Sequence, residues 1–234
     1  MPAAELKKIL KDIADPAIAA HSQKFFKTAP GEYGEGDIFL GIRVPILRHQ
    51  AKRFKQIPLK ETEQLLTSPY HEVRLCALLI LVEKYEHGDS NEREDIYRLY
   101  MKNIRYVNNW DLVDSSAPQI VGAHLYHTGK QTLFKLAASS CIWEKRISIM
   151  STLYFIRHKQ FDITLDLSEK LLNDKEDLIH KAVGWMLREI GNRDGRVKRA
   201  FLKKHYTAMP RTMLRYAIEK FPEKERKRYL KGEI

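Results

Sequence analysis

The 234-residue chain contains only two cysteines, Cys76 and Cys141, which lie 65 positions apart. A single pair at this distance is neither the disulfide framework of a small secreted domain nor the closely spaced ligand set of a zinc site. His124 and His127 are three positions apart but lack the Glu-bearing zinc motif around them. We therefore expect a protein of the reducing cytoplasm with no bound metal.

Long apolar runs are also missing, although 44% of the residues are hydrophobic. No stretch approaches the ~18 unbroken apolar residues of a membrane span. The N-terminal segment MPAAELKKILKDIADP is typical of a charged amphipathic helix rather than of a signal peptide. Neither a phosphate-binding Gly-rich loop nor a dinucleotide fingerprint occurs. We expect no membrane association and no cofactor.

Strand patterns are absent too, and the sequence favours helices separated by short breaks rich in Pro, Gly, Asn, Asp and Ser. One longer irregular stretch, TAPGEYGEGDIFLGIRVP, holds four glycines and predicts a structured or mobile loop. Pro118 predicts a kink or break in its helix. Helices are expected at residues 4–14, 16–27, 44–55, 59–67, 70–86, 90–103, 109–127, 130–139, 143–159, 162–173, 177–191, 194–205, 210–220 and 222–230.

Three of these segments resemble one another: HEVRLCALLILVEKY, WEKRISIMSTLYFIR and LIHKAVGWMLREIG. Each begins polar, has an early basic residue and continues strongly apolar. Arg74 and Arg146 are 72 positions apart, Arg146 and Lys181 are 35 apart, and half of the first interval falls on Trp110. A period near 36 with two helices each predicts an all-α solenoid of HEAT-like helix pairs, folded as one domain over residues 1–234. An irregular helical bundle is the alternative.

Positive charge is concentrated near the end of the chain. The whole chain carries +11, and residues 193–231 hold fourteen Lys and Arg against four Asp and Glu, a local excess of +10. A localised basic surface is the electrostatic footprint of a polyanion binder. A solvated helical surface with a basic bias would have the same composition.

The segment YVNNWDLVDSS predicts a helix start with a distinctive face. Asparagines favour the N-cap, and acids suit the first turn because they face the positive end of the helix dipole. At about 100° per residue, Trp110, Asp111 and Asp114 fall on one side, and the apolar residues between them fall on the other. We expect the first group to point away from the core together, on the concave surface that residues at the starts of equivalent helices line in a solenoid, which would be the DNA-binding groove.

Four motifs in order, FLGIRVPILR, WDLVDS, IWEKRISI and HKAVGWMLREIG, make the chain resemble the bacterial DNA-alkylation-repair family of HEAT-like-repeat glycosylases (AlkD type). The resemblance extends over roughly residues 5–220. It implies a monofunctional DNA glycosylase that removes cationic N3- and N7-alkylated purines from duplex DNA without base flipping, in the bacterial cytosol. We expect it to act as a monomer.

The resemblance also implies roles for four residues. Asp114 would stabilise the oxocarbenium-like sugar and position the water, while Trp110 and Trp185 shape the site and Arg146 contacts the backbone. Asp111 is the reserve carboxylate, and Trp143 is expected only to pack. Further DNA-contacting positions are expected at Phe25, Phe26, Arg74, Asn109, Asp111, Lys181 and Arg188.

The chain departs from the family pattern at two places. Asn109 stands where the best-known members have an aromatic residue, and Phe25 or Phe26 stands for an early aromatic that carries a hydroxyl there. These differences leave open a non-catalytic HEAT-like module that binds damaged or branched DNA. A protein-binding solenoid is a third alternative, which the concentrated positive charge disfavours.

Overall fold

The computed structural model describes residues 2–234, and this part of the chain contains helices and no β-strand. Its only sheet-like feature is an isolated parallel bridge between Ile38 and Tyr70. The helices pack as HEAT-like pairs, so the predicted all-α fold class is confirmed. The chain forms two compact units, residues up to 120 and residues 121–234. That both belong to one domain over residues 1–234 stays a prediction.

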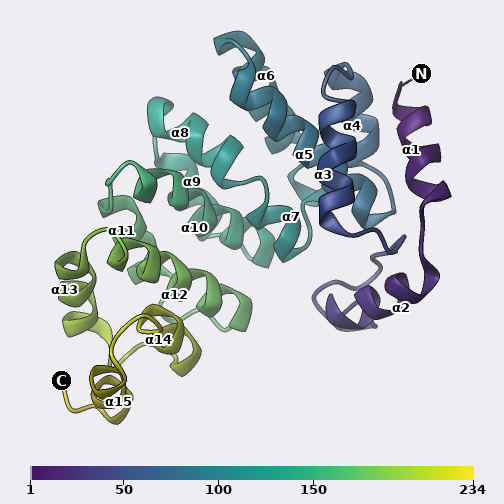
Figure 1. Cartoon of the computed structure of the whole chain (residues 1–234). Helices are drawn as coiled ribbons and strands as arrows, with labels where there is room; N and C mark the ends of the chain where they lie inside the picture. Colours follow the sequence, from purple (N-terminus) through teal and green to yellow (C-terminus); the bar gives the residue numbers. More distant parts are fainter. Residues whose placement is uncertain (1) are drawn as a thin grey trace. The chain divides into compact units, whose positions relative to one another are not determined.

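The first unit contains seven α-helices and a short 3₁₀ turn at Ile104–Tyr106 (Figure 1). The helices are α1 (Pro2–Asp12), α2 (Pro16–Phe25), α3 (Val44–Arg53), α4 (Leu59–Leu66), α5 (His71–His87), α6 (Ser90–Lys102) and α7 (Trp110–Asp114).

Helix α5 is the centre of this unit. All residues from His71 to Leu81 are buried, because α3, α4, α6 and α7 each pack against this helix (Figure 1). A helix that is apolar on every side is stable only when neighbours surround it. The first of the three similar sequence segments is therefore a core helix, and its polar N-terminal turn is buried as well.

The boundary between the two units falls within a π-helical turn at Pro118–Gly122. Its helices are α8 (Ala123–Thr128), α9 (Gln131–Ala137), α10 (Ile142–Arg157), α11 (Asp162–Lys170), α12 (Asp177–Gly191), α13 (Gly195–His205), α14 (Arg211–Ala217) and α15 (Glu223–Lys231).

The other two similar segments form the central helices of the second unit. Helix α10 packs against α8, α9, α11 and α12, and α12 also packs against α13 and α14 (Figure 1). Gly184 permits the close approach of α12 to α14, because a Cβ atom there would lie 2.5 Å from the backbone oxygen of Met213. The predicted helix at 143–159 agrees with α10 within two residues at each end, and that at 177–191 matches α12.

The predicted helix at 109–127 is interrupted, as the position of Pro118 indicates. Helix α7 ends at Asp114, the π-helical turn begins at Pro118, and α8 begins at Ala123. Proline lacks the N–H that an α-helix needs and clashes with the preceding turn. The interruption leaves α7 only five residues long, so its orientation depends on contacts with other elements.

Candidate functional site

The first turn of α7 begins where the sequence predicts. Asn109 is its N-cap, and the side-chain oxygen accepts a hydrogen bond of 2.8 Å from the backbone N–H of Trp110. Leu112 and Val113 are fully buried, as the helical periodicity predicts. The cap therefore fixes the point at which the chain becomes helical, at Trp110.

Trp110 lies at the outer edge of a group of four rings, here called the aromatic column: it stacks on Phe26, and Phe26 packs with Phe39 and His71 in a triangle. Phe26 lies 5.1 Å from Trp110 with the planes at 16°, Phe39 lies 4.9 Å from Phe26 at 22°, and His71 lies 4.4 Å from Phe39 at 21°. Trp110 is partly exposed and His71 is buried. Phe25 meets the edge of Trp110 at 5.9 Å and is 58% exposed. The column supports one aromatic surface at its outer end.

His71 also belongs to a buried polar cluster, here called the Asp37 network. Asp37 accepts hydrogen bonds from His71 Nδ1 at 2.9 Å, from Arg74 Nη2 at 2.5 Å and from Asn109 Nδ2 at 3.3 Å. The other ring nitrogen of His71, Nε2, lies 2.8 Å from Asp111 Oδ2. The network thus joins the loop after α2, the start of α5 and the first turn of α7.

Electrostatics within the network favour the charged forms. Burial alone would lower the pKa of His71, but the adjacent carboxylates of Asp111 and Asp37 raise it from 6.5 to about 9. Burial would likewise raise the pKa of Asp37, yet its hydrogen bonds and its charge interactions with His71 and Arg74 hold that pKa below the usual value. At neutral pH the imidazolium therefore stands between two carboxylates.

The loop between α2 and α3 is structured because α5 holds it. Glu72 accepts hydrogen bonds from three successive backbone N–H groups, those of Leu40 at 2.8 Å, Gly41 at 2.7 Å and Ile42 at 3.2 Å. This carboxylate is buried, and charge-assisted bonds of this kind are stronger than neutral ones. Asp37 and Phe39 belong to the same loop, so Glu72 also helps to place the network and the column.

The two aspartates of α7 do not face the same surroundings. Asp114 is partly exposed at the end of the helix. The Asp111 side chain is only 13% exposed and contacts buried His71. Within the expected face of Trp110, Asp111 and Asp114, the Asp111 carboxylate is therefore turned towards α5, which presents an imidazolium to it. That the three share a DNA-facing surface stays a prediction.

Two of the predicted DNA-contacting residues are buried within the first unit. Arg74 is 3% exposed and donates to the carbonyl oxygens of Ser68, Pro69 and Tyr106 as well as to Asp37. Asn109 is fully buried. The structure gives both side chains positions inside the Asp37 network rather than on a surface, because their polar groups bond to the protein.

The predicted residues of the second unit lie on α10 and α12. Arg146 is 5% exposed and donates to the carbonyl oxygen of Leu178 at 2.6 Å. Trp185 is partly exposed, and its indole N–H donates to Glu189 at 3.3 Å. Trp143 is 8% exposed, in keeping with packing. Lys181 pairs with Asp177 at 2.7 Å, and Arg188 pairs with Glu219.

Sequence reasoning did not identify Asp37, Phe39, His71 or Glu72. His71 and Glu72 precede Arg74 in a segment already singled out, so a buried polar helix start was a signal available there. Asp37 and Phe39 lie in an irregular loop without periodicity. Nothing in the local sequence indicates which helix such a loop contacts.

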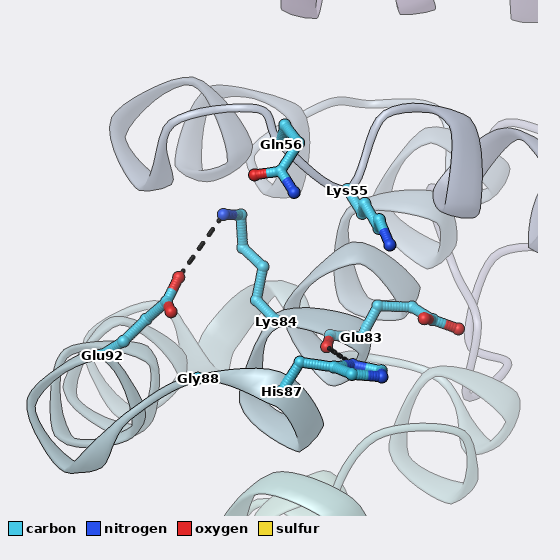
Figure 2. A pocket seen from close by; sticks show the side chains of 7 residues that line it. All are labelled: Lys55, Gln56, Glu83, Lys84, His87, Gly88 and Glu92. Carbon is cyan, nitrogen blue, oxygen red and sulfur yellow. Dashed lines mark hydrogen bonds and ion pairs between the residues drawn. The ribbon is translucent and has the colours of Figure 1, made fainter.

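Two cavities of the first unit lie outside the aromatic column. One, of about 270 Å³, borders the Asp37 network and is lined in part by Glu35, Arg74 and Asn108. The other, of about 210 Å³, is lined by residues of both charges between α3, α5 and α6, and Figure 2 shows Lys84 reaching Glu92 across it, at 3.5 Å. It contains none of the predicted site residues.

Within residues 2–234, no helix is both long and apolar enough to cross a bilayer. Over the same range, no three His, Cys, Asp or Glu side chains are arranged to share a metal ion.

Fold and site together define a HEAT-like helical protein that presents an aromatic surface and a carboxylate at one short helix. The family model described as DNA alkylation repair enzyme matches residues 6–221. The chain belongs to this family, and its role is in DNA alkylation repair.

The comparison with solved structures supports the fold. A predicted DNA alkylation repair enzyme from Enterococcus faecalis superposes with a TM-score of 0.69 at 17% sequence identity, covering 90% of this chain and 97% of that chain. A comparison with curated proteins finds no match. At this identity the structural likeness concerns the fold alone.

Proposed function

We propose that the protein is a monofunctional DNA glycosylase that hydrolyses the N-glycosidic bond of cationic N3- and N7-alkylated purines in duplex DNA, without flipping the base. The observation that carries the proposal is the short helix α7 in a chain of this family. Partly exposed Trp110 and Asp114 lie on it, fixed from below by buried groups.

The chemistry of the lesion suits a site with one such carboxylate. An alkylated purine is already a cationic leaving group, so no general acid is needed to protonate it. What remains is a developing positive charge on the sugar and a water to direct, and one ionised carboxylate can serve both. We assign this role to Asp114, the position that matches the motif of the family, and we leave Asp111 in its contact with His71.

The aromatic surface suits a sugar–phosphate partner. One face of Trp110 is covered by Phe26, so the ring is held in a defined orientation while part of it stays accessible. Aromatic faces attract positive charge, and the effect increases where water is excluded. We propose that Trp110 lies against the lesion nucleotide and that exposed Phe25 extends the same surface.

For the second unit we propose contacts with the DNA backbone. Trp185 is assigned to the sugar–phosphate and Arg146 to a phosphate, following the family resemblance. Arg146 is largely buried, so its guanidinium would have to reach the phosphate through an exposed edge or leave the carbonyl oxygen of Leu178. Lys181 and Arg188 are paired with carboxylates, and phosphate would have to exchange with those partners. The basic segment 193–231 would neutralise further phosphates and make binding depend on salt. We propose that the protein acts as a monomer in the bacterial cytosol.

The second candidate is a non-catalytic module that binds damaged or branched DNA. It is favoured by Asn109, which is buried as a helix cap and adds no aromatic ring beside Trp110. Such a protein would keep salt-sensitive DNA binding and lack base release.

The test is release of free alkylpurine from methylated duplex DNA under single-turnover conditions, with parent protein, Asp114→Asn and a matched control, Asp95→Asn. Asp95 is exposed on α6 and gives the same change of charge. We expect release by the parent and the control, and a loss of roughly 10²–10³-fold in Asp114→Asn with DNA affinity retained. Absence of release by all three, despite tight binding, would reject the glycosylase in favour of the binding module. The DNA strand should remain uncut in every reaction.

A further inference from the structure

We propose that His71 is a positioning residue of this enzyme: by joining Asp111 to the loop residue Asp37, it sets the direction in which α7 presents Trp110 and Asp114. The inference rests on the proposed function for its effect on rate. The structural part of the inference, that His71 orients α7, can be tested even if the protein releases no base.

The geometry around the ring carries the proposal. Both ring nitrogens of His71 face carboxylate oxygens, at 2.9 Å and 2.8 Å. Ionised carboxylates only accept hydrogen bonds, so both nitrogens donate and the ring is an imidazolium. The raised pKa of His71, about 9, agrees with this state. A neutral ring could donate to only one of the two partners.

Asp111 transmits the position of this ring to the helix. Its Oδ2 contacts His71, and its Oδ1 accepts from the backbone N–H of Leu112 at 2.9 Å. Asp111 follows Trp110 directly and precedes Asp114 by three residues, within the same five-residue helix. A helix this short has little stability of its own, so its orientation comes from such contacts.

Asp37 supplies a second connection to the same turn. It bonds to His71, to Arg74 and to Asn109, the N-cap of α7. The charged groups that face His71 are thus Asp37 from the loop and Asp111 from α7, with Arg74 on the far oxygen of Asp37. Phe39 stacks on the ring and Phe26 lies 5.1 Å from it, so the imidazolium is 1% exposed.

A buried ion cluster is a costly way to stabilise a fold, since apolar side chains of similar volume often perform as well. What the cluster adds is a defined orientation of α7, because each of its hydrogen bonds tolerates only a small displacement. Reaction rates depend strongly on such placement, and an error of about 1 Å in a reacting group can cost about 10²-fold. The placement of Asp114 is therefore the property on which His71 should act.

The experiment compares the parent with His71→Gln, Asp111→Asn and the double variant, and with the matched control His49→Gln at an exposed position on α3. Two readouts are taken: the single-turnover rate together with DNA affinity, and the ¹⁹F spectrum of protein labelled with 5-fluorotryptophan. The three tryptophans give separate signals, and Trp110→Phe assigns the one of interest.

We expect each single variant to lower the single-turnover rate by about 10- to 100-fold, with DNA affinity changed less than about threefold. The double variant should lose no more than the worse single variant, because both changes break one interaction. The signal of Trp110 should move in all three, and in the parent it should titrate near pH 9. His49→Gln should match the parent.

An unmoved Trp110 signal in folded His71→Gln and Asp111→Asn would overturn the positioning role, and so would an unchanged rate where the parent releases base. If His71→Gln does not fold, Asp111→Asn decides alone, because it keeps the contact between His71 and Asp37. If the Trp110 signal moves in the variants although the parent releases no base, the positioning of α7 is supported and the glycosylase is rejected. The two proposals can therefore fail separately.

Discussion

Phe26 lies flat against Trp110, with ring centroids 5.1 Å apart and planes at 16°, while its neighbour Phe25 meets the same indole edge-on. Phe25 and Phe26, consecutive residues at the end of α2, thus make different contacts with Trp110. Phe26 continues the aromatic column towards Phe39, and Phe25 is 58% exposed beside Trp110. The column fixes the tryptophan, and the exposed ring extends the surface on which it lies.

This difference predicts separable effects of two substitutions. Phe25→Ala should leave the unfolding free energy within about 0.5 kcal/mol of the parent, since its ring is mostly exposed. It should weaken binding to lesion-containing duplex by about 1–3 kcal/mol if the ring stacks on DNA. Phe26→Ala, the matched change, should lower the unfolding free energy by more than about 1 kcal/mol. Urea unfolding and fluorescence anisotropy measure the two effects, and equal stability losses would contradict the assignment.

Gly41 predicts a second contrast. Its φ is +81°, and a Cβ atom there would lie 2.1 Å from the backbone oxygen of Asp15. Gly31 has a similar φ of +80° but open space around it. Gly31→Ala should therefore cost only about 1 kcal/mol of backbone strain, whereas Gly41→Ala should cost clearly more and loosen the loop that Glu72 holds. Thermal unfolding and amide exchange of Leu40 and Ile42 test this, and equal costs would be evidence against a close approach.

Stability should fall at alkaline pH because of His71. Its folded pKa of about 9 exceeds the unfolded value of 6.5, so its contribution is complete below pH 6.5 and is lost as pH rises through about 9. The shift corresponds to on the order of 3 kcal/mol. The difference in unfolding free energy between parent and His71→Gln should shrink from pH 6 to pH 10, and a constant difference would exclude a charged His71.

Lys198 should change stability with pH in the opposite direction from His71, and it therefore serves as an internal control. Burial lowers its pKa from 10.5 to about 8, and its ammonium contacts the ring of Phe221 and donates to the carbonyl oxygen of Ala217. A basic group whose pKa is lowered in the folded protein destabilises the fold at pH values below that folded pKa. This cost is removed as pH rises from the folded pKa of about 8 to the unfolded pKa of 10.5. The advantage of Lys198→Met over the parent should therefore decrease over this range, as the same titration series can show.

Binding to duplex DNA should depend on the basic C-terminal segment. Lys203 and Lys220 are exposed there, and each phosphate contact adds about 0.9 to the slope of log K against log salt. Lys203→Gln/Lys220→Gln should lower the slope by up to about 2, without changing discrimination between damaged and undamaged duplex. Lys8→Gln/Lys60→Gln removes the same charge from exposed positions of α1 and α4. An equal effect of the two pairs would show that only net charge matters.

Much of the fold follows from local sequence. The helix boundaries agree closely, the break at Pro118 occurs where expected, and the three similar segments are α5, α10 and α12, the helices with the most neighbours. These features depend on residues within a few positions of one another, through apolar periodicity, caps and proline. The cap at Asn109 and the burial of Leu112 and Val113 belong to the same class.

The candidate site was predicted only in part, because local sequence relates neighbouring residues but not residues that meet only in the folded chain. The sequence by itself determined that Trp110 and Asp114 share a helix that Asn109 caps, because helical geometry relates neighbours along the chain. Only the tertiary structure decided that Asp111 contacts His71 and that Arg74 is buried, since these depend on which loop carboxylate reaches α5. Asp37 is 34 residues from His71 and 74 from Asp111, and the intervening chain carries no periodic signal that would relate them.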